Sequence, residues 1–276
     1  MAKIKSLLKS LSPPIIFNIL RLFKTSAKIQ EDWSGDYSTW AEAQAHCTGY
    51  DSNVILEKCK NALLKVKNGE AVYERDSVLF NQIQYSWGLL AGLQKAALEN
   101  EGKLCVVDFG GSLGSTYFQN KEFLSSLKEL KWCIVEQHHF VNCGKEFFGN
   151  EQLKFYYTIE ECVAEQKPNV LLLSGVLQYL EKPYEWLARF INLKIPYIVI
   201  DRTAFIEKEK DILTVQVVPK NIYDASYPAW FFSQNMIAFF TNNYRVLASF
   251  DGCFDSPITL NNLYKANWKG FVLKIK

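Results

Sequence analysis

Short runs of apolar residues alternate with stretches of helical length from about residue 103 onward. The apolar runs occupy Leu104 to Phe109, Trp132 to Glu136, Lys154 to Tyr157, Val170 to Leu173 and Tyr197 to Ile200. Helical patterns fill the gaps at Thr116 to Leu130, Phe140 to Phe147, Glu160 to Glu165 and Tyr184 to Ile191. Near-continuous apolar strands separated by helices are typical of a parallel sheet covered on both faces. The pattern therefore predicts an α/β fold.

The alternation becomes less regular after residue 204. A further strand is predicted at Leu213 to Val218 and a helix at Ser233 to Thr241. Two last strands, Arg245 to Phe250 and Gly270 to Lys274, follow with no helix between them. Strands joined without a helical crossover pair antiparallel. We therefore expect a mostly parallel sheet that ends in an antiparallel C-terminal hairpin.

Residues 31–100 show helical patterns and no strand alternation. The patterns cover Trp40 to Ala45, Val54 to Val66 and Val78 to Leu98. They predict a helical cap over residues 31–100, in front of a main domain over residues 101–276.

Residues 1–30 form a separate basic segment. It contains six Lys or Arg and no acidic residue, and residues 15–24 carry an apolar and a polar stripe at helical spacing. The segment is too short and too charged to cross a bilayer. Two interpretations remain open: residues 1–28 lie flat on an anionic membrane surface, or the helix packs on its own protein.

Composition and charge narrow the class of protein. The chain has 276 residues, of which 49% are hydrophobic and 22% charged, with a net charge of +2. The weak net charge gives no reason to expect a nucleic-acid partner. Seven cysteines without a CxxC pair predict reduced thiols in a cytoplasmic protein, at the inner face of the membrane if the N-terminal segment binds lipid. The three histidines lack metal-ligand spacing, so we expect no metal.

The most informative segment joins the first strand of the sheet to its first helix. The strand ends in Asp108, and Gly110, Gly111 and Gly114 follow. Glycine allows a positive φ and a close approach of the backbone to a ligand, while the helix start offers unpaired N–H groups. Glu136 ends the second strand 28 residues after Asp108, where an acid can accept hydrogen bonds from ribose hydroxyls. Two classes fit this site: nicotinamide dinucleotide enzymes and S-adenosylmethionine (SAM) methyltransferases.

The closing antiparallel pair favours the second class, because a dehydrogenase would continue with a sixth parallel strand. The chain resembles class I SAM-dependent methyltransferases over about residues 103–276, which implies their Rossmann-like seven-stranded sheet. From about Trp33 it also looks like a family of bacterial methyltransferases associated with surface-polysaccharide gene sets. The segments that carry this likeness are 33–37, 48–51, 73–77, 108–117, 135–137, 178–180, 201–203 and 226–228. Ser112 departs from the usual D/E-x-G-x-G-x-G turn, because it stands where the middle glycine would be.

The resemblance implies roles for individual residues. Asp108 would accept a hydrogen bond from the SAM ammonium group, the three glycines would contact the cofactor, and Glu136 would hold its ribose. The remaining cofactor-binding residues would be Gln137 beside adenine, Ser174 and Gln178 near the methionine end, and Arg75 at the SAM carboxylate.

Catalysis of methyl transfer requires alignment of the acceptor, and a base only where a hydroxyl must lose its proton. Asp201, at the end of the fifth strand, is the candidate base, with Arg202 to bind an anionic substrate. A structural ion pair or a helix cap explains this pair equally well. His138 and His139 are alternative bases. An aromatic group, Tyr223, Tyr227, Trp230, Phe231 and Phe232, could form a stacking wall for a sugar or belong to the core.

The predicted function is SAM-dependent methyl transfer to a small-molecule acceptor, such as a sugar or a polysaccharide precursor. Two alternatives remain: a catalytically silent scaffold with the SAM fold, and an NAD(P)-dependent oxidoreductase. The direction of the strand near Gly270 distinguishes the last of these from a methyltransferase.

Overall fold

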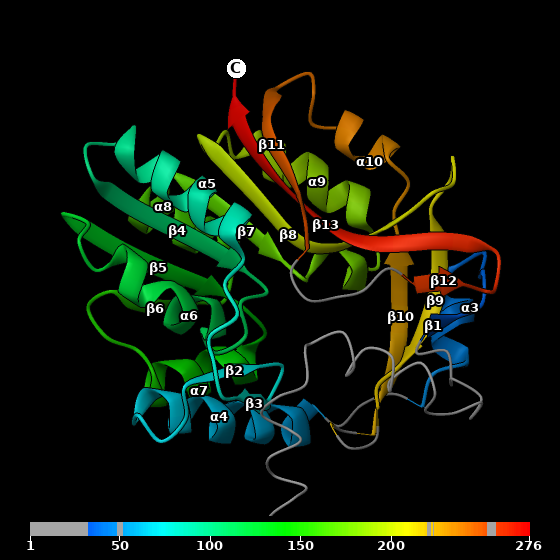
Figure 1. The fold of residues 1–276 in the computed structure, drawn as a ribbon, viewed down its shortest axis with the longest axis horizontal. Helices are drawn as coiled ribbons and strands as arrows, with labels where there is room; N and C mark the ends of the chain where they lie inside the picture. The colour runs from blue at the N-terminus through cyan, green and yellow to red at the C-terminus, as the bar shows by residue number, and fades with distance from the viewer. Residues whose placement is uncertain (1–32, 49–51, 220–221, 223, 253–257) are drawn as a thin grey trace, which may run out of the picture. The chain divides into compact units, whose positions relative to one another are not determined.

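A central twisted sheet organises the chain (Figure 1). The computed structural model describes residues 33–48, 52–219, 222, 224–252 and 258–276. The sheet has the strand order β11-β13-β8-β7-β4-β5-β6, and β12 pairs with β13 beside it. The five parallel strands are β4 (Lys103–Phe109), β5 (Glu129–Val135), β6 (Leu153–Tyr156), β7 (Val170–Ser174) and β8 (Tyr197–Ile206). Each parallel strand overlaps one of the predicted apolar runs.

The C-terminal strands close the sheet in the antiparallel direction. The long strand β13 (Tyr264–Ile275) pairs antiparallel with β8 on one side and with β11 (Tyr244–Asp251) on the other. The short strand β12 (Ile258–Leu260) also pairs antiparallel with β13. The predicted mostly parallel sheet with an antiparallel C-terminal pair is therefore confirmed. The strand containing Gly270 is antiparallel to β8, as the methyltransferase sheet requires.

Helices cover both faces of this sheet. Neighbouring residues of a strand point to opposite faces, so Val170 and Leu172 pack in one core cluster while Leu171 and Leu173 pack in the other. The helices of the first cluster are α4 (Ser52–Lys67), α5 (Trp87–Leu98), α6 (Ser115–Leu124) and α7 (His138–Phe147). Those of the second are α8 (Ile159–Gln166), α9 (Pro183–Asn192) and α10 (Asn235–Ala238). All five parallel strands are therefore buried between helices, which explains their apolar runs.

Two predicted helices are too long. The helix expected over Thr116 to Leu130 ends at Leu124, and β5 already begins at Glu129. At this end, the backbone N–H and the hydroxyl of Ser125 both donate to the carbonyl of Glu122 and cap the last turn. The helix expected over Ser233 to Thr241 is reduced to the single turn of α10.

The region before β4 contains strands that the sequence pattern did not predict. The start of the range assigned to a helix, Val78 to Leu98, instead forms the strand β3 (Val78–Phe80), which pairs with β2 (Tyr73–Arg75) in a hairpin. Asp76 and Ser77 make its two-residue turn with positive φ angles of 51° and 69°, a conformation that closes tight hairpins. The helix α5 begins only at Trp87 and packs on β4, β8 and β13 of the central sheet. A cap formed by helices alone is therefore wrong for residues 73–80.

A second, smaller sheet lies beyond the carboxyl ends of β7 and β8 (Figure 1). It consists of β1 (Trp33–Ser34), β9 (Ile212–Val217) and β10 (Ser226–Phe231), all antiparallel, and the helix α3 (Trp40–Ala45) packs against it. The 3-10 turn η1 (Leu177–Tyr179) contacts β10. This sheet forms a wall next to the point where β7 and β8 end.

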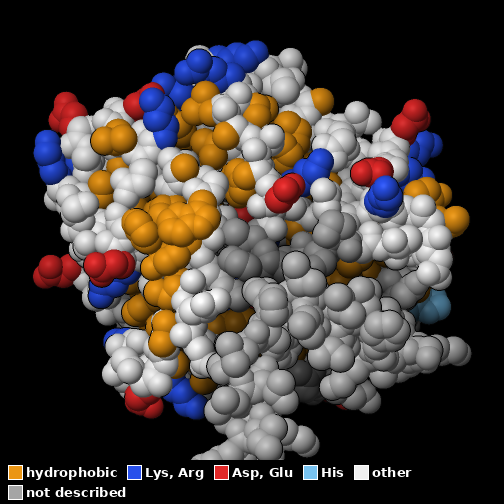
Figure 2. Space-filling view, in the orientation of Figure 1, with side chains coloured by type: hydrophobic (Ala, Val, Ile, Leu, Met, Phe, Trp, Pro, Cys, Tyr) orange, Lys and Arg blue, Asp and Glu red, His pale blue; other side chains and the backbone are white. Residues whose placement is uncertain are grey.

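Hydrophobic side chains gather on the face that Figure 2 shows. Trp87 is 60% exposed and packs with Tyr85 and with the half-exposed Phe123. In the part of the chain that the structure describes, no helix is both long enough and apolar enough to cross a membrane. The basic N-terminal segment of residues 1–30, expected either to bind lipid or to pack on the protein, lies outside the described residues.

Candidate active site

The glycine turn after β4 has the conformation that its sequence predicts. Gly110 and Gly114 have φ angles of 74° and 108°, and Gly114 is the residue that precedes α6. A methyl group placed on Gly111 would lie 2.5 Å from the carboxyl carbon of Asp108. The turn therefore requires glycine for its backbone angles at two positions and for the lack of a side chain at the third.

Ser112 takes a left-handed conformation within this turn, with a φ of 54°. The turn therefore keeps its shape with serine in place of the usual middle glycine, at the cost of backbone strain at Ser112. Cys59 of α4 lies beside it, where burial and the neighbouring acids Glu74 and Asp76 raise the pKa of the thiol to about 12. The helix α4 thus covers the turn on this side.

Replacing Ser112 with glycine should stabilise the protein. A non-glycine residue in the left-handed region costs roughly 1–2 kcal/mol, and part of this is offset by the greater freedom of glycine in the unfolded chain. We expect the free energy of unfolding of Ser112→Gly to rise by about 0.5–1 kcal/mol in urea denaturation. A variant that is less stable than the parent would show that the contact with Cys59 outweighs the strain.

Asp108 is buried at the carboxyl end of β4. Its side chain is 1% exposed and accepts a hydrogen bond of 2.9 Å from the indole nitrogen of Trp132. Burial raises the pKa of this carboxyl to about 7, the indole bond lowers it in part, and the negative charge of Glu136 raises it further. An ammonium group is the partner that would favour the ionised carboxylate.

Glu136 follows β5 and is half-buried beside the glycine turn. Its carboxylate accepts hydrogen bonds from the backbone N–H groups of Gln137, at 2.6 Å, and Ser112. Burial raises the pKa of Glu136 despite these two bonds. The two predicted acids, Asp108 and Glu136, therefore converge on the same turn, close enough for the charge of one to affect the other.

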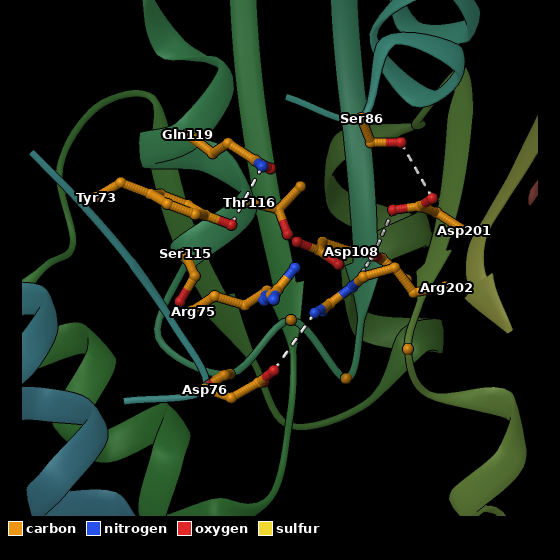
Figure 3. Close-up of a pocket in the computed structure, with 15 residues that line it drawn as sticks. Tyr73, Arg75, Asp76, Ser86, Asp108, Ser115, Thr116, Gln119, Asp201 and Arg202 are labelled. Atoms are coloured by element: carbon orange, nitrogen blue, oxygen red, sulfur yellow. Dashed lines mark hydrogen bonds and ion pairs between the residues drawn. The ribbon is translucent and has the colours of Figure 1, made fainter. Parts of the chain in front are cut away.

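The hairpin of β2 and β3 forms the wall opposite the turn (Figure 3). Tyr73, Arg75 and Asp76 line the pocket from this side, and of these three only Arg75 was predicted to bind the cofactor. Behind them the buried Glu74 accepts hydrogen bonds from the Ser115 hydroxyl and, at 3.2 Å, from the Ser77 N–H. Burial raises the pKa of Glu74 to about 7, although the bond from Ser115 lowers it in part. Glu74 fixes the hairpin to the start of α6.

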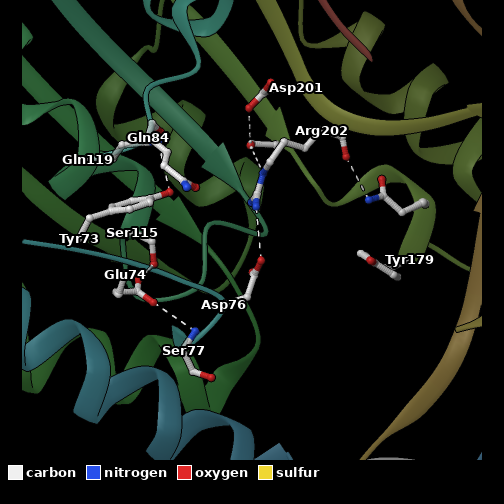
Figure 4. Close-up of polar contacts among 12 residues, drawn as sticks. Tyr73, Glu74, Asp76, Ser77, Gln84, Ser115, Gln119, Tyr179, Asp201 and Arg202 are labelled. Carbon is white, nitrogen blue, oxygen red and sulfur yellow. Dashed lines mark hydrogen bonds and ion pairs between the residues drawn. The ribbon is translucent and has the colours of Figure 1, made fainter. Parts of the chain in front are cut away.

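Asp201 and Arg202 lie on the third side of the pocket, at the middle of β8. Both carboxylate oxygens of Asp201 accept hydrogen bonds of 3.1 Å, one from Ser86 and one from Ser174, and burial raises the pKa of this carboxyl. The guanidinium of Arg202 forms an ion pair of 3.4 Å with Asp76 at the tip of the hairpin (Figure 4). Arg202 thus connects the central sheet to the hairpin.

These residues enclose a cavity of about 100 Å³. The predicted site residues that line it are Arg75, Asp108, Gly110, Gly111, Ser174, Asp201 and Arg202. Unpredicted lining residues are Tyr73, Asp76, Ser86, Ser112, Ser115, Thr116, Gln119 and Gly175. Most of the unpredicted residues come from the hairpin and from α6. Several lie in segments that carry the family likeness, but the likeness implies no role for them at the site.

Other candidates lie outside this cavity. Gly114 shapes the turn but does not line the cavity, and neither do Glu136 and Gln137. Gln178 lines a neighbouring cavity. His138 stacks on the ring of Tyr157 with centroids 4.7 Å apart, and neither His138 nor His139 lines the cavity. Two residues of the aromatic group, Phe231 and Phe232, are fully buried in the core. Tyr227 lines the neighbouring cavity, and the indole of Trp230 donates to the carbonyl of Leu180. Tyr223 lies outside the described residues. Across the described ranges, no group of three or more potential ligand side chains is arranged to hold a metal.

Comparisons with known proteins give distant structural similarities. No family model and no curated protein matches the chain. The structure is similar to the N-terminal domain of EvdMO1, crystallised with S-adenosylhomocysteine (SAH) and D-fucose, at 11% identity over 83% of this chain and 98% of that one, with a TM-score of 0.46. It is also similar to an amino pentose methyltransferase from Micromonospora echinaspora, at 9% identity over 70% and 92% of the chains and a TM-score of 0.42. A third similarity is to a Burkholderia thailandensis 1,6-didemethyltoxoflavin-N1-methyltransferase, at 12% identity over 82% and 91% and a TM-score of 0.37. These similarities are too distant to assign an activity, which depends instead on the residues of the site.

Proposed function

We propose that this protein transfers a methyl group from SAM to a small-molecule acceptor. The observation that carries this proposal is the convergence of Asp108 and Glu136 on one glycine turn, in a sheet that ends with antiparallel strands. The antiparallel β13 argues against an NAD(P)-dependent oxidoreductase. The intact acids and glycines argue against a silent scaffold.

The residues of the site fit the parts of SAM in order. The buried Asp108 needs a cationic partner, which the ammonium group provides, and Arg75 can bind the carboxylate with two parallel hydrogen bonds. Ribose hydroxyls would take the place of the backbone donors that now bond Glu136. We assign Gln137, next in the chain, to the adenine side, and Ser174 to the methionine end.

The cavity encloses only about 100 Å³, whereas sites for molecules of this size measure ~300–1,000 Å³. The cofactor would therefore extend out of the cavity, along the turn, toward Glu136. Helix α4 and the hairpin contact this turn, and these contacts would have to loosen as the cofactor binds.

The bound cofactor would supply an activated methyl group, so the protein has mainly to hold the acceptor in line and exclude water. Asp201 is the proposed base, because it lines the cavity and burial raises the pKa of its carboxyl, which makes the carboxylate a stronger acceptor for the proton of an acceptor hydroxyl. Arg202 holds Asp76 and so keeps the hairpin over the site.

Isothermal titration calorimetry with SAH tests this proposal. We expect Glu136→Ala to weaken SAH binding by about 10- to 100-fold, since two charge-assisted hydrogen bonds to the ribose are lost and the bond from the Gln137 N–H that Glu136 gives up on binding offsets part of this loss. The free energy of unfolding should change little. The matched control is Glu129→Ala at the other end of β5, where the exposed acid pairs only with Lys131. Binding of SAH that is equal in all three proteins would remove the ribose assignment, and no binding to the parent protein would favour the scaffold.

A further inference from the structure

A second cavity, of about 400 Å³, adjoins the first. Asp76, Gly175 and Arg202 line both cavities, so the Asp76–Arg202 ion pair stands at their boundary. Figure 4 shows this pair on one side and Tyr179, which also lines the second cavity, on the other. A molecule in the second cavity would therefore lie next to the methionine end of a bound cofactor.

The small sheet builds one wall of this second cavity. Trp33 of β1, Gln216 of β9 and Tyr227 of β10 are direct partners across the three strands, and all three line the cavity. Residues paired in this way lie on one face of a sheet. The hydroxyl of Tyr179 donates to the Oε1 atom of Gln216 at 2.9 Å, and its ring meets that of Tyr227 edge to face. The wall thus combines aromatic rings with a fixed carboxamide.

Gln178 also lines the cavity and has an unsatisfied polar atom. Its side chain is 4% exposed, and its Nε2 atom donates to the carbonyl of Arg202 at 3.1 Å. Because a carbonyl can only accept, this bond fixes the orientation of the carboxamide. The buried Oε1 atom has no hydrogen-bond donor among the described residues. A buried acceptor without a donor costs about 1–3 kcal/mol, so the site favours a ligand that brings a hydroxyl or amine to it.

We propose that this second cavity binds the methyl acceptor and that the acceptor is a pyranose sugar, with one hydroxyl donating to Gln178. The proposal rests on the function proposed for the adjoining cavity. A sugar ring has apolar faces, which fit aromatic side chains, and hydroxyls around its edge, which fit carboxamides that both donate and accept. The volume lies in the range of ~300–1,000 Å³ that is usual for small-molecule sites. The opposite charges of Asp76 and Arg202 offset each other, which favours a neutral ring.

Saturation-transfer NMR tests the proposal with the methyl pyranosides of glucose, galactose, mannose and N-acetylglucosamine, with and without SAH. We expect signal from at least one pyranoside. Gln178→Met and Tyr227→Ala should each weaken its binding about tenfold, which corresponds to about one hydrogen bond or ring contact. The affinity for SAH should stay unchanged in Tyr227→Ala, because Tyr227 does not line the first cavity. Gln94→Met is the matched control, because it removes a carboxamide on α5 outside both cavities.

The proposal would be overturned if none of the four pyranosides gave a saturation-transfer signal with the parent protein. It would also be overturned if a flat aromatic probe such as catechol gave a signal and the pyranosides did not. Equal pyranoside binding by the parent and by Tyr227→Ala would overturn it too, even if Gln178→Met failed to fold. A parent protein that binds a pyranoside but not SAH would instead refute the proposed cofactor and leave the sugar site standing.

Discussion

Gly110→Ala is expected to impair both stability and SAH binding severely. Gly110 has a φ of 74°, and a methyl group on it would lie 2.5 Å from a Cγ atom of Val176. The left-handed backbone costs roughly 1–2 kcal/mol for alanine, and overpacking adds about 1–3 kcal/mol. We therefore expect the free energy of unfolding to fall by about 2–5 kcal/mol in urea denaturation. SAH affinity should fall at least about tenfold, because the turn and the loop after β7 would be forced apart.

A matched control separates the two causes of this loss. Gly69 has nearly the same φ, 77°, but a methyl group on it meets nothing within 4 Å. Gly69→Ala should therefore lose only the backbone cost of about 1–2 kcal/mol and bind SAH normally. Adding Val176→Ala to Gly110→Ala removes the clash and should recover part of the stability. If the double variant recovers nothing, the backbone angle alone explains the loss.

The sheet could be predicted because its strands carry a local signal. Strands such as β7, buried on both faces, must be apolar along their whole length, and this pattern is visible without any knowledge of their partners. The turn at Gly110 and the acid at position 136 are local features as well. These local features are sufficient to predict a cofactor site at the end of β4.

The wall opposite the turn could not be predicted in this way. β2 and β3 have three residues each, too few for strand alternation to emerge, and the apolar spacing after Val78 resembles that of the helix that follows. The hairpin is held over the site by long-range contacts, from Glu74 to Ser115 and from Asp76 to Arg202. Such contacts depend on the folded sheet, so the role of Glu74 and the boundary between the two cavities appear only in three dimensions.

The affinity for SAH is expected to rise with pH, by about 50-fold between pH 5 and pH 7. The carboxyl of Asp108 has a pKa of about 7 in the free protein, so only about 1% of it is ionised at pH 5 and half at pH 7. Binding of an ammonium group requires the ionised form and lowers the pKa of Asp108, so the complex releases a proton as it forms below pH 7. Titration calorimetry in two buffers of different ionisation enthalpy measures both the affinity and this proton release. The rise levels off above pH 7, where most of the Asp108 carboxyl is already ionised in the free protein.

The stability of the free protein should change in the opposite direction. Because burial raises the pKa of Asp108 above its usual value of 3.8, the protonated carboxyl favours the folded state. This contribution is complete below pH 3.8 and is lost as the pH rises through 7. Asp108→Asn should therefore make SAH affinity low and independent of pH, and should remove this part of the pH dependence of stability. Glu74→Gln is the matched control, since Glu74 also has a pKa of about 7 but bonds Ser115 and Ser77 behind the pocket wall. A pH dependence of SAH binding that survives Asp108→Asn and disappears in Glu74→Gln would assign the ammonium group to Glu74 instead.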